Sequence, residues 1–248
     1  MNSLSAALLT RLQQAELFAF DLDGTLVDSV GDLALALNRG LKDLGWPQVS
    51  QDQVRHWVGQ GSLRLAHQCV QAHYQSLDGS DHAASLPLEA DEVQRLHQAF
   101  LHHYQQVNGH TTQLLPGALA SVQHLKKCGK KLALITNKPS AYLPTLLALF
   151  ELDTQFDLLL GGDSLLQRKP DPAPLLYAAH HLGCSPHTSV MIGDSRHDIH
   201  AARAAGFISL GLPAGYNHGE DLSLSQPDAM LGSLNDLLLI ESAVDRIG

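Results

Sequence analysis

Short apolar runs alternate with amphipathic segments near both ends of the chain. Each run is too short for a buried helix and is typical of a strand that is covered on both faces. The intervals between the runs carry apolar residues at helical spacing and often end at glycine. We predict strands at 17–20, 131–135, 156–160, 189–192, 208–210 and 230–231, and core helices at 4–16, 118–128, 140–150, 172–182, 196–205 and 235–243. Repeated strand–helix units indicate a parallel α/β sheet with right-handed crossovers.

The stretch from residue 29 to residue 111 breaks this alternation. Apolar residues recur there every three or four positions, as in Leu33, Leu37 and Leu41, and we find no convincing strand. A long helical block inside an alternating chain indicates an inserted helical domain. We therefore expect an α/β core made of residues 1–28 and 112–248, with a helical cap formed by residues 29–111.

Two acidic residues follow the first predicted strand. Asp21 lies at the carboxyl end of that strand, where open α/β sheets bind ligands, and Asp23 comes one residue later. Desolvated carboxylates are costly unless they are paired or bind a metal, and Mg²⁺ suits a site with few carboxylates plus phosphate oxygens. An ordinary loop with its turn at Gly24 is one alternative. A calcium loop is another, but it would need a third acid before the glycine and a later Glu.

Further polar residues stand at other predicted strand ends. Thr136 directly follows one strand, and Asp194 directly follows another, with Asp198 shortly after it. Lys169 lies in a loop before a predicted helix. Taken singly, each has an ordinary explanation, such as a surface lysine or a helix cap. Because all strand ends of a parallel sheet share one edge, we expect these side chains to converge around the first acidic pair.

The order of these motifs over nearly the whole chain resembles the haloacid dehalogenase superfamily of phosphohydrolases. The motifs are Asp-x-Asp-Gly-Thr at Asp21 to Thr25, the strand-end Thr136, Lys169, and Gly-Asp-x-x-x-Asp at Gly193 to Asp198. The resemblance implies a Rossmann-like parallel-sheet core with an α-helical cap inserted between the first two motifs.

The same resemblance implies a reaction in two halves. Asp21 attacks phosphorus and forms an aspartyl-phosphate. Asp23 protonates the leaving alcohol and then activates the water that hydrolyses the intermediate. Dehalogenases lack this second acid because they have no alcohol to protonate, so Asp23 favours phosphate transfer. Mg²⁺ and Lys169 neutralise the charge of the phosphate.

The family's binding residues can be carried over in the same way. The metal is expected on Asp21, the backbone carbonyl of Asp23, and Asp194, while Asp198 orients these ligands or Lys169. The expected phosphate-binding residues are Gly24, Thr25, Thr136, Asn137 and Lys169, with Gly24 and Asn137 acting through backbone amides.

Substrate choice is expected to lie in the cap, because the phosphate machinery is generic. The segments 193–196, 201–206, 215–220 and 227–228, together with a Val58-Gly59-x-Gly61 loop, resemble the bacterial phosphoglycolate phosphatase family. Gly59 and Gly61 could reach the substrate, although an ordinary interhelix turn is the alternative. Arg64 could bind a substrate carboxylate, although a solvent-facing arginine is the alternative. The resemblance implies hydrolysis of 2-phosphoglycolate to glycolate and phosphate.

Composition and charge limit the kinds of molecule that this chain is expected to bind. The chain of 248 residues carries a net charge of −9, so it has no general attraction for nucleic acid or anionic membranes. It has no apolar run near the ~18 residues of a membrane span and nothing that looks like a signal peptide, so we expect a cytoplasmic location. The expected partner is a small phosphorylated metabolite, and the oligomeric state stays open. The alternatives are a phosphatase for an amino-sugar phosphate, a sugar phosphomutase of similar fold, and a non-catalytic binding protein.

Overall fold

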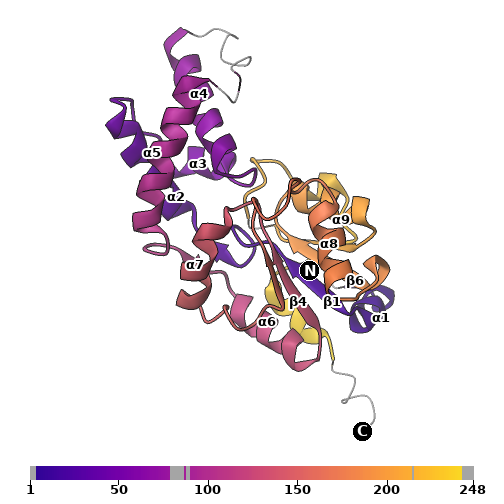
Figure 1. Cartoon of the computed structure of the whole chain (residues 1–248). Coiled ribbons are helices and arrows are strands. Elements are labelled where there is room, and N and C mark those ends of the chain that lie inside the picture. The colour runs from indigo at the N-terminus through magenta and orange to yellow at the C-terminus, as the bar shows by residue number, and fades with distance from the viewer. Residues whose placement is uncertain (1–3, 79–86, 88–89, 214, 242–248) are drawn as a thin grey trace.

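The computed structural model describes residues 4–78, 87, 90–213 and 215–241. Among these residues, six strands form a parallel sheet in the order β5-β4-β1-β6-β7-β8. Figure 1 labels its central strands β4, β1 and β6. The bounds of the six strands are β1 Leu17–Phe20, β4 Lys131–Ile135, β5 Leu158–Leu160, β6 Ser189–Gly193, β7 Ile208–Gly211 and β8 Ala229–Met230. The first strand lies between β4 and β6, and Phe20 is paired in register with Leu134 and Ile192. The predicted α/β sheet is confirmed.

Helices cover both faces of this sheet. Phe18 and Phe20 of β1 pack with α1, α6 and α7, whereas Leu17 and Ala19 pack with α8 and α9. This two-sided burial is why β1 is a continuous apolar run and not an alternating one. The core helices are α1 Ala6–Gln14, α6 Ala118–Lys127, α7 Leu143–Leu149, α8 Ala173–His181 and α9 Arg196–Ala205, with short 3-10 helices η2 Ser140–Tyr142, η3 Pro186–Thr188, η4 Leu222–Ser225 and η5 Leu234–Leu239.

Several predicted boundaries differ from the structure. The final helix, predicted as 235–243, is the 3-10 helix η5, which begins with a capping box between Ser233 and Asp236; residues 242 and 243 lie outside the described part of the chain. The predicted helix 140–150 starts as η2, and Pro144 lies in the first turn of α7, where its missing amide proton costs nothing. The strand predicted at 156–160 begins at Leu158. These errors fall at element ends, where local pattern is weakest.

The segment between β1 and β4 forms the helices α2 Val30–Asp43, α3 Gln51–Trp57, α4 Ser62–Asp78 and α5 Asp91–Val107. Figure 1 shows them grouped beside the sheet. They share a hydrophobic cluster of their own, which includes Leu37, Phe100 and Tyr104. A two-stranded antiparallel pair, β2 Val27–Asp28 and β3 Gln113–Leu114, joins the chain on its way into and out of these helices. The sequence analysis did not predict β2 or β3. The division at residues 29 and 111 agrees with this arrangement but stays a prediction.

A buried carboxylate ties the two connections of the cap together. Asp32, in the first turn of α2, accepts hydrogen bonds from the backbone amides of Gly109, Thr111 and Thr112 and from both threonine hydroxyls, at 2.5–3.2 Å. Burial alone would raise the pKa of Asp32, but the hydrogen bonds from Thr111 and Thr112 outweigh it and lower the pKa below the ordinary value. The charged form of Asp32 therefore stabilises the junction between cap and core.

We expect Asp32→Asn to lower the free energy of unfolding by about 3 kcal/mol at neutral pH, because leaving a buried hydrogen-bonding group unpaired costs ~1–3 kcal/mol. A folded-state pKa below the unfolded value means that this stabilisation is present above about pH 4 and is lost as the pH falls through the lower folded-state value. Urea unfolding of both proteins at neutral pH and at about pH 3 measures the effect. The difference should shrink in acid, and the exposed Asp153→Asn should show neither effect. Equal differences at both pH values would contradict the assignment.

Among the described residues, no helix combines the length and the apolar character that crossing a membrane requires.

Candidate active site

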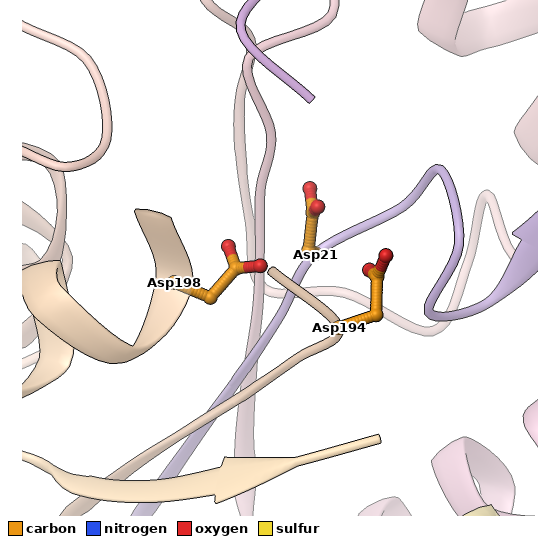
Figure 2. Close-up of side chains that lie close together, drawn as sticks. All are labelled: Asp21, Asp194 and Asp198. Carbon is orange, nitrogen blue, oxygen red and sulfur yellow. The ribbon is translucent and has the colours of Figure 1, made fainter. Parts of the chain in front are cut away.

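Three buried carboxylates converge at the carboxyl edge of the sheet. Asp21 follows β1, Asp194 follows the neighbouring β6, and Asp198 lies in the first turn of α9 (Figure 2). One oxygen of each lies within 4.8 Å of the others. The prediction that Asp21 and Asp194 lie close together is confirmed, because the strands that they follow, β1 and β6, are adjacent and parallel.

Lys169 joins this cluster from the loop before α8. Its ammonium lies 2.6 Å from Asp198 Oδ1 and 3.0 Å from Asp21 Oδ1, and it donates a 2.6 Å hydrogen bond to the Ile135 carbonyl. Burial opposes its charge, but the two carboxylates outweigh it and raise the pKa of Lys169. Asp198 has little capacity left to bind a metal ion, because its other oxygen accepts hydrogen bonds from the backbone amide and the hydroxyl of Ser195. The geometry therefore makes Asp198 a partner of Lys169, one of the two roles expected for it.

The acidic cluster carries more negative charge than the protein neutralises. Burial raises the pKa of Asp21 to about 6, against the opposing effect of Lys169. Burial and the charge of Asp21 also raise the pKa of Asp194. Like charges in a buried site resist ionisation together, and a divalent cation relieves that cost. Close carboxylate oxygens are the ligands that hard divalent cations take, so the donor set fits such an ion.

Asp194 is held in place by its surroundings. Its oxygens accept hydrogen bonds from the Thr25 hydroxyl at 2.6 Å and from the backbone amide of Tyr216 at 2.5 Å. A Cβ added to Gly24 or Gly215 would lie 2.2 or 2.1 Å from Asp194, so both positions need glycine for close approach. The sequence analysis expected Gly24 and Thr25 to contact phosphate, but the structure places the Thr25 side chain against Asp194, fully buried.

Tyr216 connects this loop to the cap. Its ring lies in the hydrophobic cluster of the cap helices. Its hydroxyl accepts hydrogen bonds from the amides of Ser29 at 2.9 Å and Val30 at 3.2 Å, at the start of α2. The sequence analysis included Tyr216 in a family-like segment but assigned it no role, because the motif gives no information about a partner so distant in the chain.

Asp23 is held by a lysine that the sequence analysis did not single out. The Lys138 ammonium lies 3.0 Å from Asp23 Oδ1 and 3.2 Å from Oδ2, and Ser29 Oγ donates to Oδ1 at 2.5 Å. Both side chains are largely buried, with 3% of Lys138 and 12% of Asp23 exposed. The sequence did contain a signal for Lys138, because this residue follows Thr136 and Asn137 at a strand end where site residues were predicted.

A cavity lies between core and cap and is lined by six of the twelve predicted site residues. Asp21, Asp23, Thr136 and Asn137 line it from the core, while Gly59 and Gly61 line it from the cap; contact of these glycines with substrate stays a prediction. Other described lining residues are Leu33, Val58, Ser62, Leu65, Phe100, Tyr104, Lys138, Pro139 and Tyr142. The half-buried Arg64 is not among the described residues that line it.

Two residues of the β4 loop have further contacts. The Asn137 side chain donates at 3.0 Å to the carbonyls of both Gly59 and Lys169, which fastens the cap loop to the core. The Thr136 hydroxyl accepts from the Lys138 amide at 3.2 Å, so its own proton can be donated elsewhere.

The chain is similar to known proteins over most of its length. A curated phosphoglycolate phosphatase of Colwellia psychrerythraea is 43% identical over 231 residues, which cover 92% of this chain and 98% of that protein. The phosphoglycolate phosphatase of Escherichia coli strain K12 is 38% identical over 227 residues, covering 89% and 90% of the two chains. A solved structure, described as a predicted phosphoglycolate phosphatase from Haemophilus somnus, matches with a TM-score of 0.83 at 36% identity, over 91% of this chain and 97% of that one.

A family model for haloacid dehalogenase-like hydrolases matches residues 18–212, which span the first strand, the cap and the Asp194 region. The chain belongs to the haloacid dehalogenase-like hydrolase family.

Proposed function

We propose that this hydrolase cleaves phosphate monoesters and that its substrate is 2-phosphoglycolate, which it converts to glycolate and phosphate. The observation that carries the proposal is that Asp21 and Asp23 come from one short loop and line the same cavity. A nucleophile and a proton donor are thereby available to one bound ester. The two curated relatives named above are phosphoglycolate phosphatases, and their matches to this chain cover 98% and 90% of their length. This similarity supports the choice of substrate.

In the first half of the reaction, an oxygen of Asp21 attacks phosphorus, and the bond from phosphorus to the leaving oxygen breaks. Lys169, 3.0 Å from Asp21, lowers the repulsion between this carboxylate and the dianionic phosphate. Asp23 gives its proton to the leaving oxygen, which therefore departs as the neutral hydroxyl group of glycolate. The Thr136 hydroxyl and the amide of Asn137 are proposed donors to the phosphate oxygens, whereas the Gly24 amide, also expected there from the sequence, already donates to the Val27 carbonyl at 2.8 Å.

In the second half, Asp23 accepts a proton from water as the water attacks the phosphorus of the aspartyl-phosphate, which regenerates Asp21. Ser29 and Lys138 hold the Asp23 carboxylate on the cavity wall through both steps. The same group thus acts as acid and then as base, because the first step leaves it without its proton.

Asp21, Asp194 and the Asp23 carbonyl are the proposed ligands of a Mg²⁺ ion, which would neutralise phosphate charge when bound. Thr25 and Tyr216 would keep Asp194 in the orientation that a ligand needs. The cytoplasmic location expected from the sequence stays a prediction.

Phosphate release from a panel of small esters, with and without Mg²⁺, tests the proposal. We expect 2-phosphoglycolate to have the highest kcat/KM, at least about 10-fold above a sugar phosphate or an amino-sugar phosphate, since one extra favourable charged contact is worth that much. Treatment with EDTA should abolish turnover, and added Mg²⁺ should restore it. Interconversion of sugar phosphate isomers without phosphate release would instead indicate a mutase, and no release from any ester would indicate a binding protein.

A further inference from the structure

Lys138 occupies an unusual position for a buried lysine. It lies in the loop between β4 and η2, is buried, and forms part of the wall of the active-site cavity. Its ammonium contacts Asp23 and also lies 4.8 Å from the centre of the Tyr104 ring, which comes from α5 of the cap. Lys138 is therefore a charge held between core and cap, beside the proposed proton donor.

The charges of the cavity wall show what Lys138 can contribute. Among the described lining residues, Asp21 and Asp23 are acidic, Lys138 is basic, and the others are neutral. Lys169 is not part of this wall, and its ammonium is already surrounded by Asp21, Asp198 and the Ile135 carbonyl. Among the described wall residues, Lys138 is therefore the one cationic side chain that a second negative group of a ligand could contact.

Tyr104 provides a second group at the same place. It is 1% exposed and lines the cavity, and its hydroxyl has no hydrogen bond of normal geometry among the described residues; it lies near the Lys138 ammonium, which is a donor and cannot accept the hydroxyl proton. Burial raises the pKa of Tyr104 to about 12, although Lys138 opposes this, so the hydroxyl keeps its proton. Stacking on Phe100, with ring centres 5.3 Å apart, and edge-to-face contact with Tyr142 at 4.8 Å hold the ring in place. A buried donor without a partner costs free energy unless a ligand accepts its hydrogen bond.

The position of Lys138 relative to Asp23 matches the length of the proposed substrate. Asp23 must contact the leaving oxygen, and the Lys138 ammonium is 3.0 Å from Asp23. In 2-phosphoglycolate, a single methylene separates the leaving oxygen from the carboxylate. A carboxylate so close to Asp23 would lie within reach of the ammonium and of the hydroxyl on the neighbouring ring. Two donors of this kind suit the two oxygens of a carboxylate.

We propose that Lys138 and Tyr104 bind the carboxylate of the substrate, and that they set the preference for a short phosphorylated acid. This proposal rests on the proposed function and replaces Arg64, which the sequence analysis suggested for the same task. Lys138 reaches the substrate from the core and Tyr104 from the cap, so the carboxylate links the two parts of the protein when it binds.

The test compares 2-phosphoglycolate with 2-hydroxyethyl phosphate, which has an uncharged hydroxymethyl group in place of the carboxylate. Lys138→Met should lower the ratio of kcat/KM values for the two esters by about 10- to 100-fold, since a hydrogen bond to a charged group contributes that much. Tyr104→Phe should lower the ratio by about 3- to 10-fold, as expected for one neutral donor. Lys138→Met also removes the partner of Asp23, so a common fall in kcat on both esters is expected, and the ratio separates the two effects.

Binding without chemistry gives an independent readout. Inhibition by 3-phosphonopropionate should weaken in Lys138→Met far more than inhibition by propylphosphonate, which lacks the carboxylate. Lys127→Met makes the same change on an exposed face of α6 and should leave both ratios as in the wild type. Circular dichroism and thermal unfolding establish that each variant is folded, and Tyr104→Phe keeps the test decisive if Lys138→Met does not fold.

Several results would overturn the proposal. An unchanged substrate ratio in both Lys138→Met and Tyr104→Phe would exclude these residues as the carboxylate site, and a fall in kcat shared equally by both esters would limit Lys138 to positioning Asp23. A selective loss in Arg64→Met alone would return the role to Arg64. If the wild type itself does not prefer 2-phosphoglycolate over 2-hydroxyethyl phosphate, the proposed function fails first, and the carboxylate site fails with it.

Discussion

Asp21→Asn should lower kcat by at least about 10⁴-fold, which is the scale of loss when a catalytic nucleophile is removed. An amide oxygen carries no full negative charge and does not form the aspartyl-phosphate. In the structure, Asp21 lies at the end of β1, contacts Lys169 at 3.0 Å, and faces the cavity. No other carboxylate of the described cavity wall has the same position relative to Lys169, so no neighbour is expected to replace it.

The sharpest measurement is rapid quenching with substrate labelled at phosphorus. Wild-type protein should carry label that survives acid and is released by hydroxylamine, as an acyl phosphate does, whereas Asp21→Asn should carry none. The fold should persist, because asparagine has nearly the same volume and the sheet around Phe20 is untouched. Near wild-type phosphate release by a folded Asp21→Asn protein would rule out the nucleophile assignment, and Asp153→Asn serves as the matched surface control.

Asp23→Asn should lower kcat by about 10²- to 10⁴-fold on an alkyl phosphate, the usual contribution of general acid–base catalysis. The amide can still occupy the site beside Ser29 and Lys138, but it can neither donate a proton to the leaving oxygen nor take one from water. Both halves of the cycle are therefore affected. The loss in the first half should be much smaller with p-nitrophenyl phosphate, because nitrophenolate leaves without a proton.

Pre-steady-state kinetics separates the halves. With p-nitrophenyl phosphate, Asp23→Asn should show a burst of nitrophenolate followed by slow turnover, since phosphorylation proceeds while hydrolysis of the aspartyl-phosphate is slow. Asp28→Asn is a close control: Asp28 lies in β2, shortly after Asp23 in the chain, bonds to Arg55 and Tyr216, and does not line the described cavity. Equal losses on the two esters, with no burst, would contradict an acid–base role for Asp23.

The amino-acid sequence was sufficient to predict the sheet and the meeting of its acids. Apolar runs such as 17–20 are buried on both faces, so the pattern reveals strands without knowledge of their neighbours. The carboxyl ends of parallel strands then share an edge by geometry alone. For this reason the convergence of Asp21 and Asp194 followed from their positions in the chain, whereas Lys169 reaches them from the loop before α8.

The roles of residues in loops and in the cap were decided by tertiary contacts. Thr25 belongs to the first motif, yet its hydroxyl bonds to Asp194, far away in the chain. Arg64 had the right chemistry for a carboxylate but not a place on the described cavity wall, whereas Lys138 and Tyr104, from core and cap, meet there. A strand end is located by a local pattern of burial, but the direction of a loop or cap side chain depends on what packs against it from elsewhere. The sequence therefore determined which residues reach the edge of the sheet, and only the folded arrangement of cap on core decided which of them face the cavity.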